Sequence, residues 1–117
     1  MNDKISEKLY LAGISAGSAC KRFMGREDLF FKYLDSFTRE PYFDLLVQAF
    51  QENDCEKAFR AAHTLKGSAG FIGADDMYAI LIEMTEGLRT GDLDGNRQRL
   101  RQLAFARQKI LKAIKKP

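Results

Sequence analysis

Apolar residues recur every three or four positions along most of the chain, which is the period of an amphipathic α-helix. The clearest run keeps this period for about five turns and consists of Cys55, Ala58, Phe59, Ala62, Leu65, Ala69 and Ile72. No segment shows the alternation of apolar and polar residues that is typical of a half-buried β-strand. The pattern therefore predicts an all-α protein in which each helix buries one stripe of its surface.

Turn residues divide this pattern into helices. Two short helices are expected in residues 1–25, and longer ones at about 26–39, 42–50, 54–71, 75–90 and after Gly95. Pro41 interrupts the first long segment, because proline lacks a backbone donor and disfavours helical angles at the residue before it. We expect a kink or break there, with Pro41 in the first turn of the second piece. Counted with that kink, residues 26–115 form an antiparallel up-down four-helix bundle in a single domain of residues 1–117.

The formal net charge of +3 conceals an uneven distribution. Residues 96–117 contain eight basic side chains and no acidic one, whereas residues 1–95 carry 11 basic and 16 acidic side chains. A basic last helix is compatible with nucleic acid or an anionic membrane. A solvated outer face is the more common reason for such a run, and we favour it.

Several classes of protein are excluded or disfavoured. No segment approaches the ~20 apolar residues of a membrane span, and the polar start MNDKISEK does not resemble a signal peptide, so we expect a cytoplasmic protein. Cys20 and Cys55 are isolated and are expected to be buried free thiols. No Gly-rich phosphate loop or magnesium-binding acidic pair is present, which argues against an enzyme that uses ATP.

His63 is the only histidine of the chain. On a helix, Lys66, Gly67 and Gly70 lie on the same side as the imidazole, which falls roughly 120° from the middle of the apolar stripe. A helical side chain leans back over the preceding turn, so glycine at position 67 leaves the ring uncovered. Each glycine costs about 0.5–1 kcal/mol in a helix. Access for a large partner to His63 would explain this cost.

The string HTLKGSAGFIGA, which begins at His63, resembles the signature of histidine-containing phosphotransfer (HPt) domains. His63, Lys66, Gly67 and Gly73 match that pattern, and the resemblance extends from roughly Gly13 to Leu111. It implies a phosphocarrier without kinase activity of its own, which accepts a phosphoryl group on His63 from a receiver-domain aspartate and passes it to another. The resemblance also implies that the short N-terminal helices pack at one end of the bundle.

Around His63 we expect a small set of further residues to act. The Lys66 ammonium can pair with phosphoryl oxygens as a point charge, although a lysine that merely faces solvent is the alternative. On the next helix, Ile82, Thr85 and Arg89 share a flank with Tyr78 by their spacing. Many HPt domains carry Gln or Glu at the position of Thr85 to hold the imidazole, and some carry a basic residue at that of Arg89. An apolar docking surface is expected from Ile82, the Leu11–Ile14 region and Phe71, which could equally belong to the core.

The expected partners are receiver domains of response regulators or of hybrid sensor kinases. Magnesium is expected only on the receiver, and we predict no cofactor, no nucleic acid, no membrane and a monomeric protein. One alternative is an HPt-like module that binds receivers or kinases without turnover. Another is a bundle that binds nucleic acid or membrane through its basic last helix, with an affinity that falls steeply with salt and does not depend on His63.

Overall fold

The computed structural model describes residues 1–114 of the chain. Seven α-helices and one short 3-10 turn account for nearly all of this segment, and no strand occurs in it apart from an isolated bridge between Ile14 and Ala74. The elements are α1 (Asp3–Leu11), α2 (Ala16–Lys21), α3 (Glu27–Arg39), α4 (Tyr42–Gln51), α5 (Cys55–Ile72), α6 (Asp75–Arg89), η1 (Asp94–Asn96) and α7 (Arg97–Ile114). The predicted helical fold class is confirmed. Lys115 and Lys116, and the predicted bundle limit at residue 115, lie outside the described residues.

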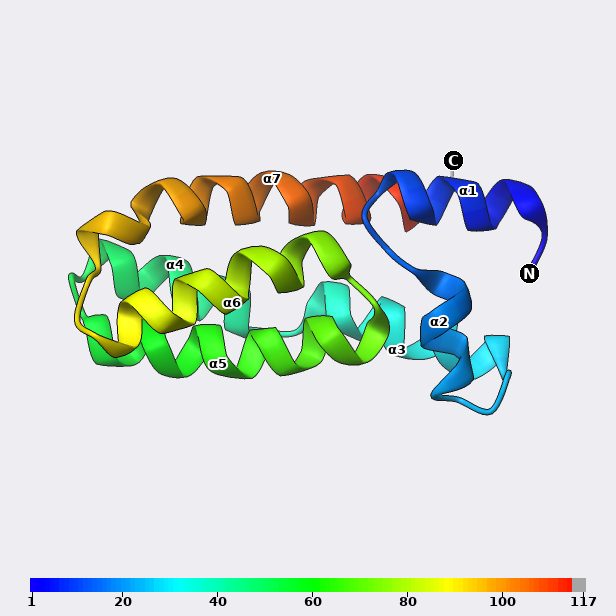
Figure 1. The fold of residues 1–117 in the computed structure, drawn as a ribbon, viewed down its shortest axis with the longest axis horizontal. Helices are drawn as coiled ribbons and strands as arrows, with labels where there is room; N and C mark the ends of the chain where they lie inside the picture. Colours follow the sequence, from blue (N-terminus) through cyan, green and yellow to red (C-terminus); the bar gives the residue numbers. More distant parts are fainter. Residues whose placement is uncertain (115–117) are drawn as a thin grey trace.

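The long helices alternate in direction along one axis of the molecule (Figure 1). Helices α3 and α4 follow each other in the same general direction, and α5 runs back beside them. Helix α6 then runs in the direction of α3 and α4, and α7 runs in the direction of α5. The most extensive packing joins α5 to α6 and to α4, and α7 packs against α6 and α3. Helix α5 also contacts α2 and α3, and part of its surface, including His63 and Thr64, stays exposed.

Pro41 separates α3 from α4, as its chemistry predicts. Glu40 takes up an extended conformation with ψ of 151°, and Pro41 is the cap residue just before α4 rather than a member of its first turn. The Glu40 carboxylate accepts a hydrogen bond from the backbone N–H of Tyr42. Burial raises the pKa of Glu40, and the backbone N–H groups of Tyr42 and Phe43 act against that shift. The Glu40 side chain thus caps the first turn of α4 at the break between the two helices.

The N-terminal helices pack at the end of the bundle where α5 turns into α6 (Figure 1). The N–H of Ser15 donates to the carbonyl of Gly73 at 2.9 Å, and α2 contacts both α3 and α5. Ile14 is only 1% exposed and belongs to the core. The prediction that the Leu11–Ile14 region forms part of an apolar docking surface is therefore wrong for Ile14. The bridge to Ala74 holds Ile14 against the turn between α5 and α6.

Within residues 1–114, the buried apolar residues form one core cluster. It draws on every α-helix, and its largest fully buried members include Phe30, Leu34, Leu46, Phe50, Leu65, Leu81, Leu103 and Ile110. The charged side chain of Arg107 packs at the edge of this core. Its guanidinium lies 4.7 Å from the centroid of the Phe43 ring and donates a hydrogen bond to the carbonyl of Thr38 at 3.1 Å. This contact fastens α7 across the α3–α4 break.

Candidate functional site

Helix α5 presents His63 near its midpoint, on an exposed part of its surface. The helix begins where the Asp54 side chain accepts a hydrogen bond from the N–H of Lys57 at 3.0 Å. It ends at Gly73, whose φ of 77° is the left-handed conformation that a helix C-cap requires and that glycine adopts without strain. Both ends are capped, and buried residues from Ala58 to Ile72 fix the helix on the core. His63 is therefore displayed on a rigid segment.

The imidazole rests against Phe59, one turn earlier on α5. The two rings stack with centroids 5.9 Å apart and an interplanar angle of 27°. Residues at i and i+4 of a helix are neighbours, so the spacing could have indicated this contact. The sequence pattern had placed Phe59 only in the core stripe, and the structure shows it half-buried at the edge of the core. It supports one side of the imidazole while His63 stays exposed.

The two glycines that follow His63 have different surroundings. A Cβ atom added at Gly67 would meet nothing within 4 Å, so packing does not require glycine there. A Cβ added at Gly70 would lie 3.0 Å from Cε1 of Tyr78, so the close approach of that ring accounts for Gly70. The Tyr78 ring is thus a sufficient reason for glycine at position 70, whereas clearance around His63 is the reason that we expect at position 67, which borders open space. The binding role expected of Gly70 stays a prediction.

Lys66 is half-buried on the same side of α5 as His63. Its ammonium is close enough to Glu86 of α6 to contribute to the lowered pKa of that carboxyl, although the hydrogen bond from Arg89 is the largest cause. No carboxylate in residues 1–114 forms an ion pair with Lys66. The lysine thus faces the α6 side of the site and keeps its hydrogen-bonding capacity for another anion.

Thr85 is buried, so it does not present its side chain on the exposed flank of α6 where the sequence places a binding role. Its side chain is only 3% exposed, and its hydroxyl donates within its own helix, to the carbonyls of Leu81 at 2.8 Å and Ile82 at 3.0 Å. Such back-bonding is common for threonine inside helices. The hydroxyl proton is therefore already engaged, and the stacking on Phe59 is the contact that the structure gives the His63 ring.

Ile82 and Arg89, the other two residues expected on this flank of α6, are exposed. The Arg89 guanidinium pairs with the Glu86 carboxylate at 2.7 Å. Their hydrogen bond stabilises both charged forms, so it raises the pKa of Arg89 and lowers the pKa of Glu86. Arg89 is thus available at the surface only in competition with Glu86. Its binding role stays a prediction, as does that of Ile82.

This electrostatic arrangement can be tested by titration. The Glu86 carboxyl pKa should rise when Arg89 is replaced by methionine, and by a smaller amount when Lys66 is replaced by methionine, because these cations stabilise the charged form. Carboxyl-detected NMR titration of the three proteins measures both changes, and high salt should reduce them. Since the folded-state pKa is depressed, the stabilisation is present above the unfolded pKa and is lost as pH falls through the folded value. An unchanged Glu86 pKa in Lys66→Met would place the ammonium away from this site.

Beyond Gly70 the surface forms an open hollow of about 490 Å³. Its lining comes from α5, from the start of α6 and from the N-terminal helices, and consists of Arg22, Gly67, Gly70, Phe71, Asp75 and Tyr78. Arg22 is held there by a hydrogen bond of 3.2 Å from its guanidinium to the carbonyl of Phe71. The sequence pattern had given no sign of Arg22, because only the fold brings residue 22 beside residue 71.

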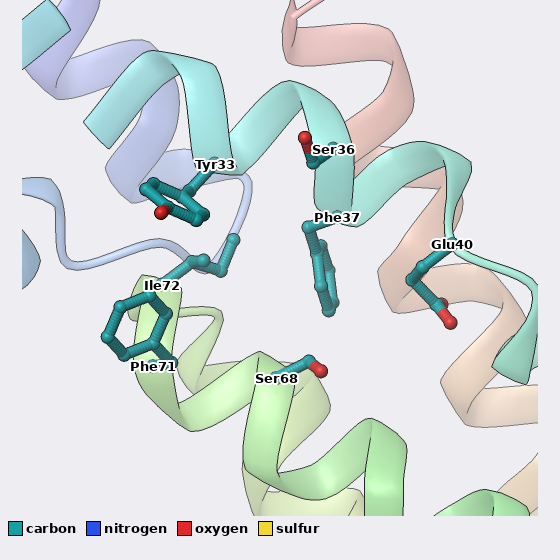
Figure 2. Close-up of a pocket in the computed structure, with 7 residues that line it drawn as sticks. All are labelled: Tyr33, Ser36, Phe37, Glu40, Ser68, Phe71 and Ile72. Carbon is teal, nitrogen blue, oxygen red and sulfur yellow. The ribbon is translucent and has the colours of Figure 1, made fainter. Parts of the chain in front are cut away.

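Phe71 belongs to both the exposed surface and the edge of the core, the two alternatives that the sequence left open. Its ring is 45% exposed, yet it packs edge-on against Phe23, with centroids 5.1 Å apart, and against Tyr33, at 5.8 Å. Figure 2 shows Phe71 and Tyr33 at one end of a separate pocket of about 170 Å³, with Glu40 at the other end and Phe37 and Ser68 between them. This pocket does not include His63 and is not part of the candidate site.

Within residues 1–114, no group of three or more His, Cys, Asp or Glu side chains is arranged to hold a metal ion. The helices of this segment are all too short or too polar to cross a bilayer. Cys20 is buried and Cys55 is half-buried, and the Cys55 thiol donates to the carbonyl of Leu88 at 3.4 Å. Burial raises the pKa of the Cys20 thiol.

Comparison with known proteins agrees with this geometry. A family model described as Hpt domain matches residues 38–115, about two thirds of the chain, and the match includes His63, Lys66 and the glycines that follow. Neither curated proteins nor solved structures gave a match. Hpt domains are helical bundles that act as phosphocarriers in phosphorelay signalling. On the extent of the match, the chain belongs to the Hpt domain family, whose function is histidine phosphotransfer.

Proposed function

We propose that His63 is the phosphoacceptor of this Hpt domain, receiving a phosphoryl group from the aspartyl phosphate of one receiver domain and passing it to another. The observation that supports this most strongly is the exposed imidazole on a rigid, capped helix in a chain of this family. In the first step the bond between phosphorus and the receiver carboxylate breaks as a nitrogen–phosphorus bond forms. The attacking nitrogen must be unprotonated, because only then does it offer a lone pair.

The residues around His63 have separate roles in this reaction. Phe59 limits the rotation of the ring by stacking, which keeps the nucleophile close to one orientation. Lys66 holds the new phosphoryl group by its charge, and Gly67 lets the receiver approach the ring. The receiver domain supplies its own magnesium ion, and this chain needs no cofactor. Arg89 and Ile82 lie at the rim of the surface that the receiver contacts.

The direct test is transfer from a phosphorylated receiver. A receiver domain is labelled with radioactive acetyl phosphate, purified and mixed with the full chain, and the label on the chain is then examined. Phosphohistidine should appear as a label that acid removes and base does not, and mass spectrometry should place it on residue 63. Binding of the receiver without any transferred label would instead favour the alternative of an interaction module without turnover.

Gly67 provides a prediction in which stability and activity change in opposite directions. Gly67→Leu should leave the fold intact or stabilise it by about 0.5 kcal/mol or more, because leucine is the better helix former and the space is open. The leucine side chain leans back toward His63 and should slow transfer by about tenfold or more, which corresponds to 1.4 kcal/mol in activation free energy. Chemical denaturation and the transfer assay measure the two effects.

Ala104→Leu is the matched control, since Ala104 is an exposed helical residue of α7 and lies outside α5. It should leave the transfer rate unchanged. Gly70→Ala should gain less stability than Gly67→Ala, because the Tyr78 ring must move to admit the methyl group. If Gly67→Leu transfers at the wild-type rate, the open space at position 67 has no part in receiver access.

A further inference from the structure

A second surface with the features of an interface lies between α6 and α7. The groove has a volume of about 560 Å³, with Ala79 and Ile80 of α6 and Phe105 and Ala106 of α7 as its apolar lining. Helix α7 packs mainly against α6, α3, α1 and η1, whereas His63 is on α5. None of the residues that line the groove belongs to α5 or to the candidate site around His63, so a protein bound there would leave that site free.

Several large apolar side chains in and beside the groove are highly exposed to solvent. Phe105 is 68% exposed, although it sits in the middle of a helix. Next to the groove, a hollow of about 330 Å³ is lined by Tyr10 and Leu11, which are 75% and 68% exposed. Asp76 lines both hollows, so the two are neighbours. Exposed apolar side chains gathered around one depression mark an interaction site more often than isolated ones do.

The two rims of the groove differ in charge, because Asp76 lies on the α6 rim and Arg101 and Lys109 lie on the α7 rim. Most arginines of α7 are engaged, since Arg97 pairs with Asp94, Arg99 pairs with Glu83, and Arg107 lies against Phe43. By contrast, Arg101 bonds only to the amide oxygen of Gln98, and the Lys109 ammonium lies 5.2 Å from the centroid of the Phe105 ring. Within residues 1–114, neither cation is paired with a carboxylate. The α7 rim thus offers two uncompensated positive charges beside apolar surface.

The dimensions of the groove fit a helix. Its α7 side runs from Gln98 to Lys109, which is about 17 Å at 1.5 Å per residue, or three turns. Both walls are helices whose backbone groups bond within their own helix, so the groove offers no ladder to an extended strand. A helix satisfies its own backbone and needs only side-chain contacts. Arg101 and Lys109, eight residues apart, would meet carboxylates about two turns apart on such a helix.

We propose that the α6–α7 groove binds an amphipathic helix of a partner protein, with its apolar side chains on Phe105 and Ala79 and carboxylates along one flank facing Arg101 and Lys109. This interaction is separate from phosphoryl transfer. It would keep the domain bound to its partner while receiver domains bind and dissociate at His63.

The test uses two synthetic peptides of about 15 residues, roughly 22 Å of helix, with leucines at helical spacing. One peptide carries glutamates along one flank of the leucine stripe, and the other carries lysines there. Fluorescence anisotropy measures their affinities for the full chain, and amide NMR shifts locate the binding. The acidic peptide should bind between α6 and α7, and the lysine peptide should bind more weakly by about tenfold or more.

Two variants of exposed residues complete the design. Phe105→Ser and the double variant Arg101→Glu with Lys109→Glu should each weaken the acidic peptide by about tenfold or more. Met24→Ser, at an exposed turn far along the chain from α7, is the control and should not change the affinity. All three variants should keep the wild-type circular dichroism spectrum, because the substituted side chains are exposed or half-exposed.

Four results would overturn the proposal. The first is no saturable binding of the acidic peptide, or shifts that centre on α5. The second is equal binding of both peptides or no effect of the charge-reversed variant. The third is a dimer in sedimentation equilibrium that Phe105→Ser dissolves, which would make a second copy of the chain the occupant. The fourth is binding of duplex DNA with loss of affinity in Arg101→Glu and Lys109→Glu but not in Phe105→Ser, which would make the rim a nucleic-acid site.

Discussion

His63→Gln is expected to reduce phosphoryl transfer to the background of the assay. Glutamine has nearly the same polarity and can occupy the exposed position, but its amide nitrogen has no available lone pair with which to attack phosphorus. The imidazole is the only histidine side chain in the protein, so no neighbour can replace it. The measurement is the acid-labile label transferred from a phosphorylated receiver, compared between the two proteins at equal concentration.

The fold should survive this substitution, which makes the loss of activity interpretable. His63 is exposed and loses only its stacking on Phe59, so the free energy of unfolding should change by no more than about 0.5 kcal/mol. Receiver binding, measured by calorimetry, should persist in His63→Gln, because the surrounding surface is intact. A label that persists at the wild-type level would show that another residue accepts the phosphoryl group.

The largest change in stability is expected for Leu65→Ala. Leu65 lies two residues after His63 on α5 and is fully buried among the core residues. Truncating a buried leucine removes its transfer free energy and leaves a cavity, so the free energy of unfolding should fall by about 2–5 kcal/mol. A domain of this size has ~5–15 kcal/mol in all. Chemical denaturation monitored by circular dichroism measures the difference.

Thr64→Ala is the matched control, since it removes a side chain of similar size from the adjacent, exposed position. It should change the stability by no more than about 0.5 kcal/mol. If the two substitutions cost the same, the assignment of the buried and exposed faces of α5 would be wrong. That result would also undermine the exposed position of His63, because the two faces are fixed by one helical register.

The core face of α5 follows from sequence because it depends only on the helix period. The apolar run that ends at Ile72 predicted which side of α5 is buried, and Leu65, Ala69 and Ile72 are buried as expected. The same period placed His63 on the flank, and the residue is exposed. The break before Pro41 also follows from local chemistry, since it depends on the proline ring and on the residue before it.

The four residues expected on one flank of α6 show where this reasoning stops. Tyr78, Ile82, Thr85 and Arg89 lie within about 60° of one another at 100° per residue, so a shared flank does not by itself decide which of them is buried. In the structure three of them are exposed, and Thr85 is buried with its hydroxyl turned back onto its own helix. Thr85 lies nearest of the four to the buried stripe of α6, and only the packing of the helices shows that the core extends far enough round α6 to cover it.

The sequence by itself determined the helical class, the helix limits to within a few residues, the buried stripe of α5 and the exposed position of His63 with Lys66 on the same side. Only the tertiary structure decided that Ile14 is buried, that Gly70 makes room for Tyr78, and that Arg22 reaches Phe71. The physical reason is range. Helical periodicity reports the direction of a side chain about its own axis, whereas contacts across helices depend on how separate axes are packed together.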